Sequence, residues 1–171
     1  MNINLIATLQ TFDGKHVTPF QAAAQALPPT ADTVAMLCDV AKSEEKAVEI
    51  GATWLIKHFL EQRVLVDEAT ASQIIALLAT VREPDSILHL LQSLPHITIP
   101  APAETPLHQA LTRHLIAKHK FVRAWSYNGL GLLAKQNEVY REEALALFAA
   151  AQETEAASVK VRIRKAGSLL K

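Results

Sequence analysis

Apolar residues recur every three or four positions along most of this chain. That spacing places apolar side chains on one side of an α-helix, whereas a half-buried strand would alternate apolar and polar residues. The pattern therefore predicts an all-α protein with a short helical N-terminal cap over residues 1–29, followed by four consecutive helix pairs. The predicted helices are 3–11, 18–26, 31–42, 44–62, 68–81, 84–94, 106–119, 121–136, 140–153 and 159–170.

Residues suited to helix ends flank several of these segments. Asp67 precedes the helix over 68–81, where its carboxylate can accept a hydrogen bond from a free backbone N–H group. Pro84 fits the first turn of the next helix, because the N–H group it lacks has no partner there. Ser43 is placed in the same way as Asp67, and we expect it to be the N-cap of the helix over 44–62.

One segment departs from the helical pattern. Residues 95–106 contain four prolines in twelve positions, which excludes a helix and a central strand. We expect a Pro-rich, extended connection between the second and third helix pairs. It could be a spacer or a functional loop, since long connections serve as either.

Two helical segments can be aligned at an offset of 37 residues, which indicates an internal repeat. When 122–133 is laid over 159–170, Val122 matches Val159, Arg123 matches Lys160, and both segments end in Leu-Leu. Two offsets earlier, Val48 begins a similar segment. These matches predict equivalent helices in one repeat domain over residues 1–171.

The pattern at 122–133, Val-Arg-x-x-Ser-x-x-Gly-Leu-Gly-x-Leu, resembles the second helix of a HEAT repeat, and 159–170 resembles a weaker copy. The resemblance covers residues 30–171. It implies a right-handed α-solenoid of HEAT-like, or armadillo-like, helix pairs whose second helices line a concave face. HEAT-like solenoids mostly bind other proteins, and some bind nucleic acid, so the resemblance implies a binding function.

Composition and charge add two points. The 171 residues are 50% hydrophobic but only 5% aromatic, with 5 glycines, which suits packed helices better than a β-sandwich. Net charge is zero, yet residues 1–105 carry 6 Lys and Arg against 12 Asp and Glu, and residues 106–171 carry 11 against 5. Such a division affects the choice of partner and the association rate more than the fold.

The chain carries no sign of export. A secretory signal has basic residues before its apolar stretch, and residues 1–10 contain none. No apolar run approaches the roughly 20 residues of a membrane span. Cys38 is the only cysteine and lies among apolar residues, so we expect a buried thiol without a disulfide. We expect a cytoplasmic protein without a membrane partner.

The sequence contains few residue patterns that would indicate catalysis. His108, His114 and His119 point in different directions or lie too far apart along one helix to share a metal ion, and His58 with Glu61 would supply only two ligands. No nucleophile motif or phosphate-binding glycine loop occurs. The acidic residues at helix starts, Glu49 among them, are interpreted as solvated. We therefore expect no cofactor and no enzyme activity, although an enzyme that acts on nucleic acid is a remaining alternative.

Basic residues of the second half are the best candidates for binding. Arg123 and Lys160 share a repeat position, so they could bind phosphates or an acidic partner, or else brace the stack and cap its end. Tyr127 is expected to face outward, and Trp125 is expected to lie in the core. We predict a non-catalytic adaptor that binds a protein or peptide on the concave face, and a nucleic-acid-binding solenoid is the alternative. The candidate binding residues are Arg113, Lys120, Arg123, Tyr127, Lys160 and Arg164.

Overall fold

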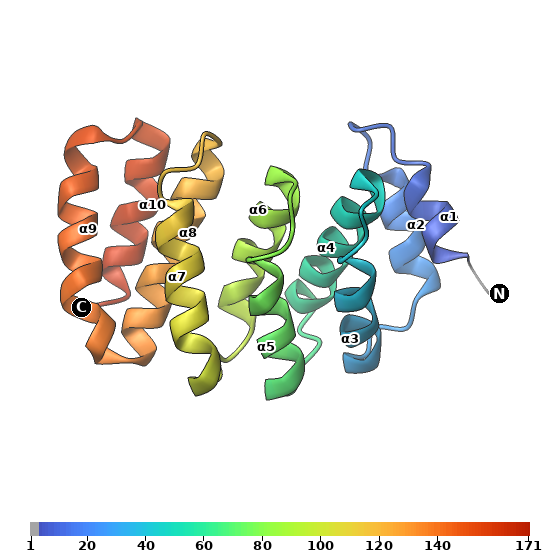
Figure 1. Ribbon diagram of the computed structural model, residues 1–171, viewed down its shortest axis with the longest axis horizontal. Coiled ribbons are helices and arrows are strands. Elements are labelled where there is room, and N and C mark those ends of the chain that lie inside the picture. The colour runs from blue at the N-terminus through green and yellow to red at the C-terminus, as the bar shows by residue number, and fades with distance from the viewer. Residues whose placement is uncertain (1–3) are drawn as a thin grey trace. The chain divides into compact units, whose positions relative to one another are not determined.

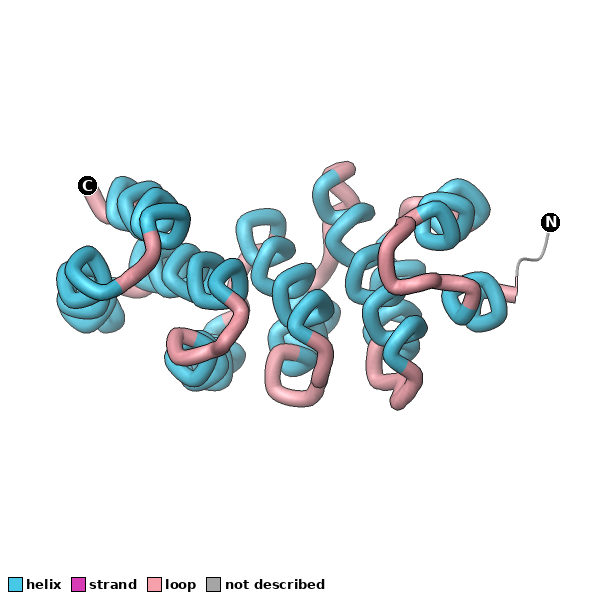
Figure 2. The backbone as a smooth tube through the Cα atoms, turned by 90° about the horizontal axis from the view of Figure 1, so that it is seen from above, coloured by secondary structure: helices cyan, strands magenta, loops and turns pink. Residues whose placement is uncertain are grey.

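Helices account for nearly all regular structure in the computed structural model, which describes residues 4–171 (Figures 1 and 2). No strand occurs in that range, which confirms the all-α prediction. Each predicted helix overlaps one observed helix, and residue 3, the predicted start of the first, lies outside the described residues. The helices are α1 (Leu5–Gln10), α2 (Thr18–Ala26), α3 (Ala31–Val40), α4 (Lys46–Glu61), α5 (Glu68–Leu77), α6 (Pro84–Ser93), α7 (Glu104–His114), α8 (Lys120–Gln136), α9 (Arg141–Thr154) and α10 (Ala157–Ser168).

Side-chain caps fix several of the helix starts. The Asp67 carboxylate accepts a hydrogen bond of 2.8 Å from the backbone N–H of Thr70, which confirms its predicted role at the start of α5. Pro84 occupies the first turn of α6, also as predicted. The prediction for Ser43 was wrong, because α4 begins only at Lys46 and the Ser43 hydroxyl instead accepts from the N–H of Glu45 in the preceding turn.

The chain forms two compact units, of which the first ends at Thr98 and the second is Ile99–Lys171. The boundary falls within the Pro-rich segment 95–106. That segment is less extended than predicted: it contains two single turns of 3-10 helix, η1 (Leu94–His96) and η2 (Ala101–Ala103), and α7 already begins at Glu104. Such turns are short enough to contain proline near their first position. A single repeat domain over the whole chain stays a prediction.

In unit 1, α3 packs against α4 and α5, and α4 packs against α6. The N-terminal helices α1 and α2 also lie against α4. Gly51 allows this close approach, because a Cβ atom there would lie 2.7 Å from side-chain atoms of both Leu9 and Phe20. Leu9, Phe20 and the inward residues of α4 are fully buried and form the core of this part of the unit.

In unit 2, α8 is the central helix and packs against α7, α9 and α10. Its contact with α10 is close at Gly131, where an added Cβ would lie 2.9 Å from the carbonyl oxygen of Ala166. Ser126 and Gly129, the small residues of the aligned pattern, are buried as well. Most residues of α8 between Ala124 and Ala134 are buried, so this helix has almost no solvent-exposed side in its middle.

The three aligned valines occupy the same place in their helices. Val48, Val122 and Val159 are the third residues of α4, α8 and α10, and each is at most 1% exposed. Their neighbours are therefore comparable position by position. The fourth residues are Glu49, Arg123 and Lys160.

Candidate functional site

Arg123 was the leading predicted binding residue, and its guanidinium is held by the protein itself. Nε and Nη2 donate hydrogen bonds of 2.8 and 3.0 Å to the two carboxylate oxygens of Glu155, in the turn before α10. Nη1 donates to the carbonyl oxygens of Ala117 and Lys118, in the loop before α8. These charge-assisted bonds raise the pKa of Arg123. The side chain joins two loops of unit 2, which is the bracing role rather than the binding role.

Glu49 has the corresponding role in unit 1. Its side chain is almost fully buried, and its carboxylate accepts hydrogen bonds from the backbone N–H groups of Arg82 and Glu83, at distances of 2.9 to 3.2 Å. These groups precede α6, whose positive end favours a carboxylate. The interpretation of Glu49 as a solvated residue was therefore wrong. In both units the fourth residue of a second helix binds the loop within the following helix pair.

Tyr127 was predicted to face outward, and that prediction was wrong. The residue is 7% exposed, and its ring meets the ring of Phe148 edge-on, with 6.1 Å between the centroids. Burial raises the pKa of its hydroxyl group. Tyr127 joins α8 to α9 and has little surface left for a partner.

The other four predicted residues lie on three helices of unit 2. Arg113 and Arg164 are exposed, on α7 and α10, and Lys160 is partly exposed one turn before Arg164. Lys120 begins α8, and its amino group lies 5.2 Å from the centre of the Phe121 ring. The structure brings Lys160 and Arg164 onto one side of α10, and Lys120 belongs to a different surface.

That surface, the second-helix face of unit 2, combines rings from α8 with cations from α10. Phe121, Trp125 and Leu132 are spaced by four and seven residues, so they follow one another along the same side of α8. The guanidinium carbon of Arg162 lies 4.0 Å from the centre of the Trp125 ring, and Lys165 is one turn further along α10. Trp125 is only partly buried, so its prediction as a core residue was incomplete.

The chemistry of this face suits a partner with both apolar and acidic groups. Phe121 is 46% exposed, and Trp125 and Leu132 are partly exposed. Among the described residues, neither Arg162 nor Lys165 forms an ion pair, so both charges are free to meet a carboxylate or a phosphate. A guanidinium held over an aromatic ring by its charge keeps N–H groups that can still donate to an anion.

Unit 1 presents a different set of side chains on its second helices. The rings of Trp54 and His58 stack with 4.8 Å between their centroids, and both residues are partly exposed. On α6, burial and, to a smaller extent, the positive charge of Lys57 together lower the pKa of His89 to about 4. His89 is therefore neutral at pH 7, and its Nδ1 lies 3.2 Å from the hydroxyl of Thr53. This region carries less positive charge than the second-helix face of unit 2.

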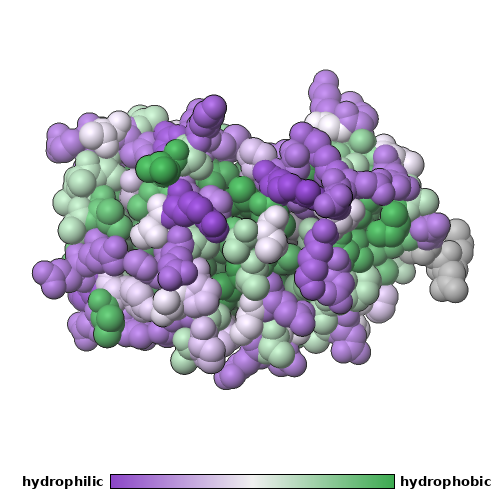
Figure 3. Space-filling view, in the orientation of Figure 1, coloured by the Kyte–Doolittle hydropathy of each residue, from purple (hydrophilic) through white to green (hydrophobic). Residues whose placement is uncertain are grey.

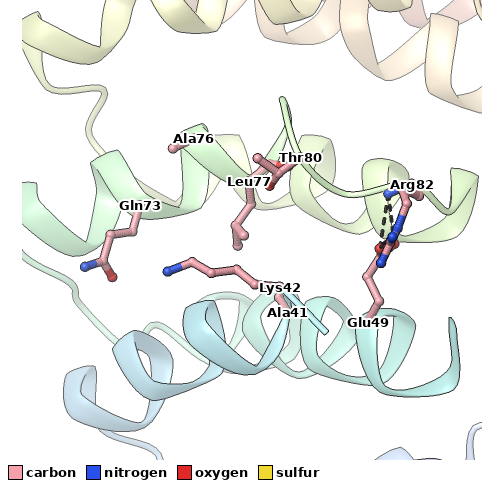
Figure 4. Close-up of a pocket in the computed structure, with 8 residues that line it drawn as sticks. All are labelled: Ala41, Lys42, Glu49, Gln73, Ala76, Leu77, Thr80 and Arg82. Carbon is pink, nitrogen blue, oxygen red and sulfur yellow. Dashed lines mark hydrogen bonds and ion pairs between the residues drawn. The ribbon is translucent and has the colours of Figure 1, made fainter. Parts of the chain in front are cut away.

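A cavity of about 300 Å³ opens in unit 1 between α5 and the turn that follows α3 (Figure 4). Ala41, Ala76 and Leu77 supply apolar lining, and Figure 4 shows Glu49 and Arg82 together at one end. Two of the charged groups of the lining are already engaged: Glu49 binds the N–H groups before α6, and the Lys42 amino group lies 2.6 Å from the Asp39 carboxylate. The cavity thus offers apolar contact and few free polar groups.

Reactive side chains do not gather at any of these places. Cys38 is fully buried, as predicted, and burial raises the pKa of its thiol to about 12, so the nucleophilic thiolate is scarce at neutral pH. Within residues 4–171, no three His, Cys, Asp or Glu side chains are grouped closely enough to hold a metal ion.

Comparison of the chain with protein-family models, with curated proteins and with solved structures returned no match. None of the described helices combines the length and the apolar character that crossing a bilayer requires. The case for a function therefore depends on the surfaces above.

Proposed function

We propose that this chain is a HEAT-like α-solenoid that serves as a non-catalytic binding module for a protein or peptide. Two observations support the repeat architecture. Val48, Val122 and Val159 hold the same position in α4, α8 and α10. Each of two second helices also packs against the next second helix of its own unit, α4 against α6 and α8 against α10, as stacked repeats require.

The binding site in this proposal is the second-helix face of unit 2, on the side that would be concave in a HEAT-like stack. The contact between Trp125 and Arg162 carries the proposal, because it combines a partly exposed ring with a cation that has no carboxylate partner in the described chain. Aromatic and arginine side chains are the residues that contribute most at protein interfaces. Phe121 and Lys165 extend the same combination along the two helices.

This proposal can be tested by affinity capture from an extract of the source organism, in which the proteins captured by the wild type are compared with those captured by variants. We expect Trp125→Ala and Arg162→Glu each to remove the same small set of captured proteins. Leu65→Ser is the control, because Leu65 is 83% exposed in unit 1 and lies far along the chain from this face. Partners that are retained by both Trp125→Ala and Arg162→Glu would contradict the proposal.

A nucleic-acid ligand is the second candidate, and a specific observation favours it. Lys120 beside Phe121 and Arg162 over Trp125 pair cations with rings, as surfaces that stack bases and bind phosphates do. Fluorescence anisotropy with labelled single-stranded and duplex oligonucleotides would separate the candidates. Binding to nucleic acid should weaken steeply between about 50 and 200 mM salt and should be lost in Trp125→Ala. Absence of binding at the lower salt concentration would exclude this candidate.

A further inference from the structure

On α4 and on α8, one side of the helix is covered by the helix pair that follows it in the same unit. On α4 this side includes Glu49 and Thr53, which contact the loop before α6 and His89 on α6. On α8 the equivalent residues are Arg123 and Tyr127, which contact Glu155 and Phe148 of the α9–α10 pair. Thr53 is fully buried and Tyr127 nearly so.

On α10 the equivalent side is open within the described chain. In the 37-residue alignment, Lys160 and Arg164 correspond to Arg123 and Tyr127, and both are at least partly exposed. Lys171, just beyond the end of α10, is exposed as well. Among the described residues, none of the three forms an ion pair. The covered side of α4 and α8 is thus replaced here by three free cations.

A groove lies beside these cations, between α9 and α10, with a volume of about 560 Å³. Leu145, Phe148, Ile163 and Gly167 give it an apolar lining, and Arg164 and Lys171 complete its basic edge. Leu145 is 44% exposed, and no carboxylate lines the groove. Figure 3 shows weakly hydrophobic residues over the middle of α9, with hydrophilic residues towards both of its ends. We call this surface the end groove.

We infer that the end groove binds an acidic amphipathic helix of another protein. The α9–α10 pair covers the same side of α8 with an apolar ring, Phe148, and a carboxylate, Glu155, in the turn between the two helices. An acidic amphipathic helix offers the same two kinds of group. Lys160 and Arg164 are four residues apart on α10, or about 6 Å along its axis, a distance that carboxylates one turn apart on a partner helix can match. Lys171 follows just beyond the end of α10 and adds a third positive charge.

Charge repulsion argues against a second copy of this chain as the occupant of the end groove. A second copy that met the end groove through its own end groove would set three cations against three cations, an arrangement that opposes association. A partner with carboxylates on either side of an apolar stripe meets no such repulsion. This inference uses different residues from the second-helix face, so each can fail without the other.

The test is a nuclear magnetic resonance titration of the full, uniformly ¹⁵N-labelled chain with a designed helical peptide. The peptide has about 18 residues, leucines at positions i, i+4 and i+7, and glutamates on both flanks of that stripe. Its matched control carries lysine at every glutamate. We expect saturable shifts at the amides of Leu145, Ala149 and Gly167 with the acidic peptide, weaker binding at higher salt, and no binding of the lysine peptide.

Gly167 provides a matched pair of variants. A Cβ there would meet only Phe148, at an ordinary 3.8 Å, so Gly167→Ala should fold normally and bind as the wild type does. Gly167→Leu extends a side chain into the end groove and should weaken binding by about tenfold or more. Arg164→Glu should weaken it by about tenfold through repulsion, without filling the groove.

Three results would overturn the inference: no saturable shift, equal binding of the lysine peptide, or unchanged affinity in both Gly167→Leu and Arg164→Glu. Shifts confined to Phe121, Trp125 and their neighbours would also overturn it. That last pattern would assign the peptide to the second-helix face and would leave the proposed function standing.

Discussion

Gly131 is the position at which the packing of unit 2 can be tested most directly. Replacing it by alanine adds one methyl group to α8 at a position that faces Ala166 of α10. That Cβ would lie 2.9 Å from the Ala166 carbonyl oxygen and 3.1 Å from the Ala166 Cβ. Both neighbours belong to the rigid part of a helix, so α10 itself has to move away from α8.

The expected magnitude follows from two opposing effects. Alanine is favoured over glycine inside a helix by about 1 kcal/mol, because glycine loses more backbone freedom on folding. Overpacking a well-packed interface costs about 1–3 kcal/mol. Ala166, Val159 and Ile163 on α10 are all buried, so little space exists to absorb the shift. We expect Gly131→Ala to lower the free energy of unfolding of unit 2 by up to about 2 kcal/mol, the overpacking cost less the gain from alanine.

Gly167→Ala is the matched control, because the same substitution on α10 meets no atom closer than 3.8 Å. It should raise the free energy of unfolding by about 0.5–1 kcal/mol. Urea unfolding followed by the fluorescence of Trp125, in a Trp54→Phe background, reports on unit 2 alone. Equal stabilisation by both substitutions would refute the close approach of α8 and α10 at Gly131.

Three further predictions concern the polar contacts. Glu49→Ala leaves the backbone N–H groups before α6 without their acceptor and should lower the free energy of unfolding by about 1–3 kcal/mol. Glu44→Ala removes a side chain that is 92% exposed and forms only a 3.7 Å surface ion pair with Arg82, so it should change the free energy little; urea unfolding measures both. A double-mutant cycle of Arg123→Ala and Glu155→Ala should give a coupling of about 1–3 kcal/mol, and a coupling near zero would show that the bidentate contact is absent. His89 has a folded pKa of about 4 against 6.5 when unfolded, so the unfolded state binds more protons between these values. Stability should therefore fall as the pH decreases from 6.5 towards 4, by up to about 3 kcal/mol, and His89→Leu should remove that pH dependence.

The positions of the helices were predictable because their apolar spacing is regular and caps such as Asp67 mark their ends. The direction in which individual side chains of α8 point could not be predicted. A periodic pattern identifies the buried side of a helix only when the other side is polar, and α8 is covered by three helices. Tyr127 therefore packs against Phe148 where the pattern placed it outward, and Trp125 is less buried than the pattern suggested.

The contacts of Arg123 could not be predicted, because they depend on Glu155, 32 residues further along the chain. The contact between Trp125 and Arg162 did leave a signal. The 37-residue alignment places Arg162 at the position of Trp125, and equivalent positions on adjacent stacked helices lie side by side. The alignment therefore contains enough information to predict a cation beside this ring.

The contacts of Glu49 and Arg123 restrict how this chain can be rearranged. Glu49 is satisfied by backbone N–H groups, whereas Arg123 requires a carboxylate in the same place. If the α9–α10 pair were transplanted to follow α4, Glu155 would face Glu49 and two buried carboxylates would repel each other. The helix pairs are therefore not interchangeable, and a duplicated or shuffled pair would persist only with a compensating change of charge at the fourth residue of the helix before it.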